Sequence, residues 1–225
     1  MEETLKTSWP EFLTVLKTDI LPLYEAHEKK FDFQLIHGRM HIARALIFSE
    51  FMCRYYYRNT DLAPDAERVR FAVAFHDSGR RGNGPDFWES DSAQLCIDYL
   101  RANNLTNDAK ETGLLIMKHG IGDWGLDKRI VHDADVLEIM RPCCGHMGRK
   151  GFRENALRFL GNRDVKTVYN REIRDGLIEE AWQFIQITED LKPDLRESAD
   201  YMKDVLNTLR VESKRWPLLA DYILE

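Results

Sequence analysis

The sequence predicts an all-α protein, and two observations lead to this prediction. Apolar residues recur at helical spacing in segment after segment, and no stretch alternates apolar and polar residues for long enough to form paired strands. The 225 residues are 44% hydrophobic and 31% charged, which is ordinary for a globular domain with a sizeable core. We therefore expect one domain over 1–225, with a site-bearing core at 35–140 and a C-terminal helical extension at 150–225.

The first predicted helix begins near a possible capping box. Ser8 and Glu11 have the required spacing, and Pro10 between them suits a first helical turn. We expect this helix to continue to about His27. Its predicted core-facing residues are Phe12, Leu13, Leu16 and Ile20.

Two further helices are predicted before the first clear loop. A long one should begin near His37 and continue to the tyrosines at 55–57. The next should follow Pro64 and end at Gly79, because proline and glycine mark helix boundaries. The segment 79–86 contains three glycines and a proline and is the clearest loop in the chain.

The rest of the chain is also predicted to be helical. Helices are expected at 87–100, at 107–119 and at 128–140, the last of them closed by Pro142. Amphipathic helices are expected at 165–188, at 194–209 and near Leu218. We expect the chemistry to lie in the first two thirds of the chain, and packing or a lid to be the role of the last third.

The composition limits the partners and the compartment. A net charge of −6 argues against binding to long nucleic acid, although a local basic pocket for a small phosphorylated substrate remains compatible with it. No apolar run approaches the ~20 residues that a membrane span requires, so no membrane partner is expected. The N-terminus lacks a signal-peptide pattern and the four cysteines lack a disulfide framework, so we expect a cytoplasmic protein.

Histidines and aspartates recur in or beside the predicted helices. His37 and His41 are four residues apart and share a helix face, while His76 and Asp77 end an apolar stripe. Burying Asp77 without a partner would be costly, and a shared cation would satisfy both members of that pair. Imidazole and carboxylate groups are ligands for divalent transition metals, and nearby arginines favour a phosphate ester as substrate.

A late helix carries two more candidate aspartates. Asp133 and Asp135 lie in an apolar context and point about 200° apart on a helix, so both can hardly face one ion. Each has apolar neighbours at helical spacing, so periodicity leaves the choice between them open.

These segments, in this order, resemble the HD superfamily of metal-dependent phosphohydrolases. The matching segments are His41-Ile-Ala-Arg44, His76-Asp77-Ser-Gly-Arg80 and Asp133-Ala-Asp135-Val-Leu-Glu. The resemblance implies an all-α fold and a divalent metal (Mn²⁺, Fe²⁺, Ni²⁺, Co²⁺, Zn²⁺ or Mg²⁺). The ligands that it implies are His41, His76, Asp77 and Asp135.

Further roles follow from this resemblance and from side-chain chemistry. Asp77 would orient the attacking water as well as bind the metal, and Arg80 would contact phosphate through its guanidinium fork. Arg44 would contact substrate or pair with a site carboxylate. His119 is expected to act as a general acid or to contact the substrate, because an imidazole titrates near neutral pH.

A second resemblance is narrower. The pattern His37-Gly-x-x-His41, the loop at 80–89 and the late histidine are similar to phosphodiesterase domains of bacterial effectors that act on phosphoribosyl-linked ubiquitin. In those domains two histidines and a glutamate carry out acid–base chemistry without a metal. The resemblance implies that His37 or His41, together with Glu89 and His119, would be the catalytic residues.

The functional prediction is metal-dependent hydrolysis of a phosphomonoester or phosphodiester, with a nucleotide or another small phosphorylated compound as substrate. The alternatives are the metal-independent phosphodiesterase and a non-catalytic nucleotide-binding module. A zinc site at Cys143, Cys144 and His146 is not expected, because adjacent cysteines lack the usual ligand spacing and no second pair completes the site.

Overall fold

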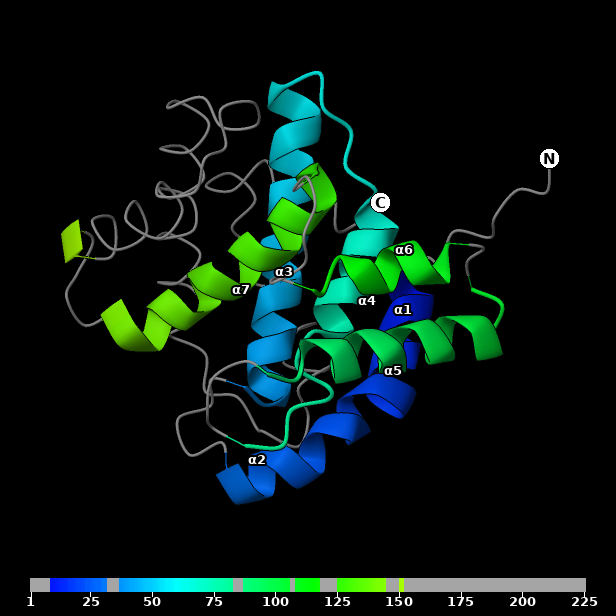
Figure 1. Ribbon diagram of the computed structural model, residues 1–225. Coiled ribbons are helices and arrows are strands. Elements are labelled where there is room, and N and C mark those ends of the chain that lie inside the picture. Colours follow the sequence, from blue (N-terminus) through cyan, green and yellow to red (C-terminus); the bar gives the residue numbers. More distant parts are fainter. Residues whose placement is uncertain are drawn as a thin grey trace.

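The computed structural model describes residues 9–31, 37–82, 87–105, 108–117, 125–144 and 150–151. Within these ranges the elements are helices, and no strand occurs among them, so the all-α prediction is confirmed (Figure 1). The helices expected at 165–188, at 194–209 and near 218 lie outside the described residues, and so does Ser8 of the expected capping box. No described helix is both long and apolar enough to cross a bilayer.

The N-terminal helical region changes its hydrogen-bonding pattern along its length. It consists of α1 (Trp9–Val15), a π-helical segment η1 (Leu16–Ile20), a 3₁₀ turn η2 (Leu21–Tyr24) and α2 (Glu25–Phe31). The sequence predicted one continuous helix here. Pro22 has no amide hydrogen and its ring crowds the carbonyl four residues earlier, which disfavours regular α-helical hydrogen bonding at this point. The buried face includes Phe12, Leu16 and Ile20, as predicted.

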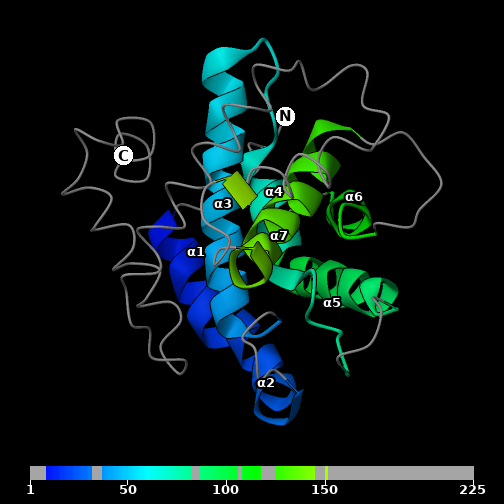
Figure 2. The same ribbon diagram turned by 90° about the vertical axis from the view of Figure 1, so that its left-hand side faces the viewer.

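The long helix α3 (Arg39–Asn59) is the central element of the described fold. It begins two residues after His37, with Gly38 as its extended N-cap. It packs against α4 and α7, and Figure 2 shows α1 on one side of α3 with α4 and α7 on the other. The first turns of α3 therefore face neighbours from both sides.

The short helix α4 (Ala66–Phe75) carries the apolar stripe predicted from the sequence. Asp65 caps it by accepting a hydrogen bond from the Arg68 amide at 3.1 Å. Its residues Val69, Phe71, Ala72, Val73, Ala74 and Phe75 are all buried. The helix ends in a turn over 76–79, close to the predicted stop at Gly79.

The remaining helices are α5 (Glu89–Ala102), α6 (Ala109–Leu114) and α7 (Leu126–Cys144). The prediction that the helix at 107–119 continues to residue 119 was wrong, because α6 ends at Leu114. Beyond it the hydrogen bonds join residues three apart, from Leu115 N to Thr112 O and from Ile116 N to Gly113 O. The prediction that Pro142 closes α7 was also wrong. The helix continues to Cys144 without the hydrogen bond that an amide at residue 142 would have donated.

Candidate active site

The turn after α4 presents His76 and Asp77 and is fixed against the start of α5. The Gly79 amide donates to Ser92 Oγ at 2.9 Å. A Cβ atom at Gly79 would lie 2.6 Å from the Ser92 nitrogen and 2.7 Å from Asp91 Cβ, so only glycine allows this approach. The position of the His-Asp pair therefore depends on how closely α5 packs against the turn.

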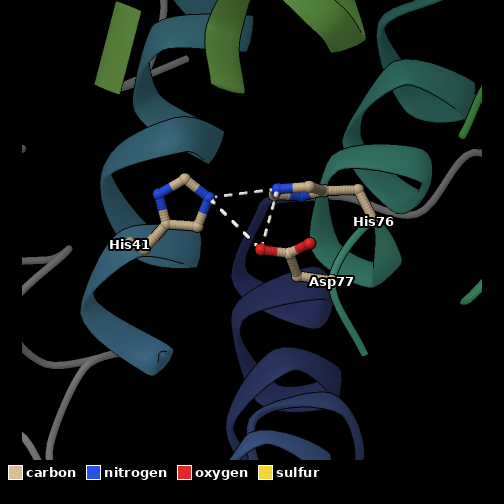
Figure 3. A group of neighbouring side chains, drawn as sticks. All are labelled: His41, His76 and Asp77. Carbon is tan, nitrogen blue, oxygen red and sulfur yellow. Dashed lines mark hydrogen bonds and ion pairs between the residues drawn. The ribbon is translucent and has the colours of Figure 1, made fainter. Parts of the chain in front are cut away.

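The structure brings together the four side chains predicted as metal ligands. His41 Nε2 lies 3.0 Å from His76 Nε2 and 3.3 Å from Asp135 Oδ1, and His76 Nε2 lies 3.5 Å from the same oxygen. Asp77 Oδ2 lies 4.0 Å from His41 Nε2 and 3.8 Å from His76 Nε2. Figure 3 shows His41 on α3 facing His76 and Asp77 from the turn after α4. All four residues are buried.

The two aspartates of α7 differ in their contacts. Asp135 reaches both site histidines, whereas Asp133 Oδ1 lies 2.7 Å from Nδ1 of its neighbour His132. Asp133 and Asp135 are both buried, which is why apolar periodicity did not separate them.

The outward nitrogens of the two central histidines already have partners. His76 Nδ1 donates to the Val73 carbonyl at 2.7 Å, and His41 Nδ1 lies 2.6 Å from Glu138 Oε2. Both Nε2 atoms therefore turn toward each other and toward the carboxylates. Two imidazole lone pairs at this distance need a proton or a cation between them.

The charges around the pair favour a cationic occupant. Burial lowers the pKa of His41, but the charge of Glu138 and the hydrogen bonds that His41 donates to Asp135 and Glu138 outweigh burial and raise this pKa to about 10. Burial raises the pKa of Asp77, yet the charge of His76, the hydrogen bond from His37 and the charge of Arg80 hold it well below its usual range. Asp77 is thus ionised at neutral pH.

The donor set also fits a divalent metal. His41, His76 and Asp77 each offer a ligand atom, and these atoms lie within 4.8 Å of one another. Asp135 adds an oxygen beside both imidazoles. Histidines whose second nitrogen bonds a carboxylate or a backbone carbonyl are typical of metal sites, and mixed nitrogen and oxygen donors suit several transition metals.

His37 lies at the accessible side of this cluster. Its Nδ1 donates to Asp77 Oδ2 at 3.0 Å. The His37 side chain is 14% exposed, whereas those of His41 and His76 are 0% and 2% exposed. Among these three imidazoles, His37 is the one that a substrate can approach most readily.

The structure also places His27 beside the site, which the sequence reasoning missed. The ring centroids of His27 and His37 are 6.3 Å apart, those of His37 and His41 are 6.1 Å apart, and those of His41 and His76 are 5.1 Å apart. These four imidazoles form a continuous row. His27 lies within a charged segment of α2, so nothing in the sequence separated it from an exposed residue.

Both predicted substrate-binding arginines are buried, and both contact carboxylates. Arg80 Nε lies 3.2 Å from Asp77 Oδ1, and Arg80 also lines a hollow of about 330 Å³ together with Arg81 and residues of α5. Arg44 Nε donates to Glu138 Oε1 at 2.5 Å, so the structure shows the carboxylate pairing that the sequence left as one of two options. Contact of either arginine with substrate remains a prediction.

The two remaining predicted residues differ in what the structure describes. Glu89 is the buried first residue of α5, whose start is fixed against the Gly79 turn. Burial lowers the pKa of Lys128 on α7, and the negative charge of Glu89 partly opposes this shift. His119 lies outside the described residues, as does His146, and the side chains of Cys143 and Cys144 are not described either.

Comparison with known proteins gives one match. A model of the SidE phosphodiesterase (PDE) domain matches residues 24–196, well over half of the chain. No curated protein and no solved structure matches the chain significantly. The match supports the resemblance to effector phosphodiesterases, and the resemblance to the HD superfamily stays a prediction.

Proposed function

Because the chain belongs to the SidE phosphodiesterase domain family, we propose that it hydrolyses a phosphodiester at the cluster formed by His37, His41, His76, Asp77 and Asp135. The proposed chemistry is acid–base catalysis by histidine and glutamate, as in the effector domains that the sequence resembles. The site is buried except at His37, which limits attack to a group that reaches the cluster from that side.

The contact between His37 and Asp77 carries this proposal. An ionised carboxylate can only accept hydrogen bonds, so Asp77 Oδ2 holds the proton on His37 Nδ1 at 3.0 Å. With the proton on Nδ1, His37 Nε2 carries the lone pair of the ring and can act as a base. An aspartate that fixes a histidine tautomer in this way is the arrangement that other hydrolases use to activate an oxygen nucleophile.

The proposed reaction balances as a simple hydrolysis. A water oxygen attacks phosphorus while His37 Nε2 takes the proton from that water. The bond from phosphorus to the leaving oxygen breaks, and that oxygen receives a proton from a general acid. The resemblance assigns this second role to Glu89 or His119. The products are a phosphomonoester and an alcohol.

The substrate proposal follows the same resemblance. The first compound to test is a protein conjugate in which a phosphoribosyl group joins ubiquitin to a hydroxyl, and small nucleotide phosphodiesters form a second class. We also propose, from the sequence, a small phosphorylated substrate and a cytoplasmic location. Neither long nucleic acid nor a membrane is proposed as a partner.

The test measures hydrolysis of both substrate classes with excess chelator and without it. We expect cleavage of the conjugate that persists in chelator and falls about 10²–10⁴-fold in His37→Asn. Glu89→Gln and His119→Ala should also lose activity. His132→Asn is the matched control, since His132 is a buried histidine that contacts Asp133. Binding without turnover of any phosphodiester would contradict the proposal and favour a non-catalytic module.

A metal-dependent phosphohydrolase is the second candidate function. The observation that favours it is the convergence of His41, His76, Asp77 and Asp135, the ligand set implied by the HD resemblance. A divalent metal held there would polarise a phosphoryl oxygen of the substrate. Under this alternative, chelator and Asp77→Ala each abolish both metal content and activity, and added Mn²⁺ restores the chelated enzyme only.

A further inference from the structure

A fully buried carboxylate on α7 lies behind the site histidines. Glu138 is 0% exposed, and its two oxygens contact different donors. Its Oε2 lies 2.6 Å from His41 Nδ1, and its Oε1 accepts from Arg44 Nε at 2.5 Å. A carboxylate at such depth is tolerated only when charged or polar partners surround it. Both of these partners come from α3.

The register of the two helices produces this arrangement. His41 and Arg44 are three residues apart on α3, and Asp135 and Glu138 are three residues apart on α7, so each pair shares a face. One member of each pair faces the site, where His41 Nε2 lies 3.3 Å from Asp135 Oδ1. The other members, Arg44 and Glu138, meet one turn further along.

The consequence for His41 is a fixed orientation. Because an ionised carboxylate only accepts hydrogen bonds, Nδ1 of His41 carries a proton whenever it bonds Glu138. The other nitrogen, Nε2, is then held toward His76, Asp77 and Asp135. Without that carboxylate, a half-turn of the ring or a change of tautomer would remove Nε2 from the site.

We propose that Glu138 is a positioning residue, which holds His41 with Nε2 facing the reaction centre while Arg44 fixes the carboxylate. Glu138 acts through His41 and makes no contact with the substrate. This inference rests on the proposed function for its catalytic consequence, but the orientation of His41 can be measured without any substrate.

The first variant is Glu138→Gln. The two donors bond different oxygens, so an amide must place its NH₂ group against one of them, and the permanently charged Arg44 is expected to keep the oxygen. We expect kcat to fall about 10- to 100-fold, the usual effect of removing a group that orients a site histidine. KM should change little, because Glu138 does not reach the substrate.

The matched control is Glu50→Gln. Glu50 is also a buried glutamate, but it lies on α3 and bonds none of the site histidines in the part of the chain that the structure describes. Its Oε1 accepts hydrogen bonds from two nitrogens of Arg70, at 3.0 Å and 2.9 Å. Both variants should lower the unfolding temperature, and only Glu138→Gln should lower kcat. Equal loss of stability with unchanged kcat in Glu138→Gln would overturn the proposal.

Nitrogen-15 NMR of labelled histidine provides the second readout. In the wild type we expect a His41 Nδ1–H proton that exchanges slowly with water and resonates far downfield. Glu138→Gln should lose that signal, and Glu50→Gln should retain it. If Glu138→Gln does not fold, Arg44→Lys replaces it and should weaken the same signal. A His41 signal unchanged by the variant would contradict the inference.

The two proposals fail in different ways. A wild-type protein that cleaves no phosphodiester would refute the proposed function, and the NMR comparison would still decide the role of Glu138. An active wild type whose Glu138→Gln variant keeps both its kcat and its His41 signal would refute this inference alone.

Discussion

His41 Nε2 lies 3.0 Å from His76 Nε2, and the second nitrogen of each ring is already engaged, by Glu138 and by the Val73 carbonyl. The two rings therefore present facing nitrogens, one from α3 and one from the turn after α4, although the residues are 35 positions apart in the chain. Such a pair must share a proton or a cation. The predictions below separate these options and test the surrounding residues.

Addition of a divalent cation should distinguish the two aspartates of α7. If a metal binds, excess Mn²⁺ or Zn²⁺ should raise the unfolding temperature of the wild type, because a ligand that binds only the native state stabilises it. Asp135→Asn should lose this shift, and Asp133→Asn should keep it, since Asp133 contacts His132. Thermal unfolding followed by circular dichroism measures both. Equal shifts in the two variants would contradict the assignment of Asp135.

Neutralising Asp77 should reduce catalysis far more than neutralising an exposed aspartate. Asp77→Asn removes the acceptor for His37 Nδ1, so we expect kcat to fall about 10²–10⁴-fold. Asp91→Asn is the control, because the Asp91 side chain is 45% exposed and pairs with the exposed Arg81. Steady-state kinetics on one phosphodiester measures kcat of each variant relative to the wild type. Similar losses in both variants would rule out a special role for Asp77.

Two adjacent arginines should differ in their effect on substrate turnover. The Arg80 side chain is 2% exposed and pairs with Asp77, whereas that of Arg81 is 72% exposed. Arg80→Ala should lower kcat/KM about 10- to 100-fold, since a hydrogen bond to a charged group is worth about 1.5–3 kcal/mol. Arg81→Ala should stay close to the wild type. A larger loss of kcat/KM in Arg81→Ala than in Arg80→Ala would place the phosphate contact at Arg81 instead.

Two nearby glycines should respond differently to alanine. A Cβ at Gly79 would meet the Ser92 nitrogen at 2.6 Å, whereas the nearest atom to one at Gly82 is 3.9 Å away on Trp88. Overpacking of this kind typically costs about 1–3 kcal/mol, so Gly79→Ala should be destabilised and should lose activity. Gly82→Ala should retain both properties. Denaturant unfolding with parallel kinetics tests the pair, and a fully active Gly79→Ala would show that the turn tolerates displacement.

The stability of the protein should decrease in alkaline solution partly because of Cys96. Burial raises the pKa of the Cys96 thiol to about 12, while an unfolded thiol has a pKa of about 8.5. Between these values the unfolded state binds fewer protons, so the free energy of unfolding falls as pH rises, by about 1.36 kcal/mol per pH unit. Cys96→Ala should show a shallower decrease in guanidinium unfolding. Identical slopes would mean that Cys96 does not titrate differently in the two states.

The sequence predicted the helices from local patterns, and it also pointed to the histidines and aspartates that the structure brings together. The apolar stripe of α4 and the histidine spacing on α3 are visible without tertiary contacts. The interruption at Pro22 and the passage of α7 through Pro142 were missed, because the cost of a proline can be offset by packing that the sequence does not display.

The supporting residues of the site were harder to predict than its central ones. Glu138 ends the segment that resembles the HD superfamily, but a glutamate in a helix is usually exposed, and no role was predicted for it until α3 and α7 were placed together. The same contact decided between Asp133 and Asp135, which periodicity could not separate.

Different parts of α3 contribute to the site and to stability. Its first turns carry His41 and Arg44, and its middle carries Glu50, which binds Arg70 of α4 and lies 3.7 Å from Arg54 Nε. Substitutions in the middle of α3 can thus change the free energy of unfolding while leaving the reacting groups in place. A chain organised in this way can adapt to a new temperature and to a new substrate through separate sets of mutations.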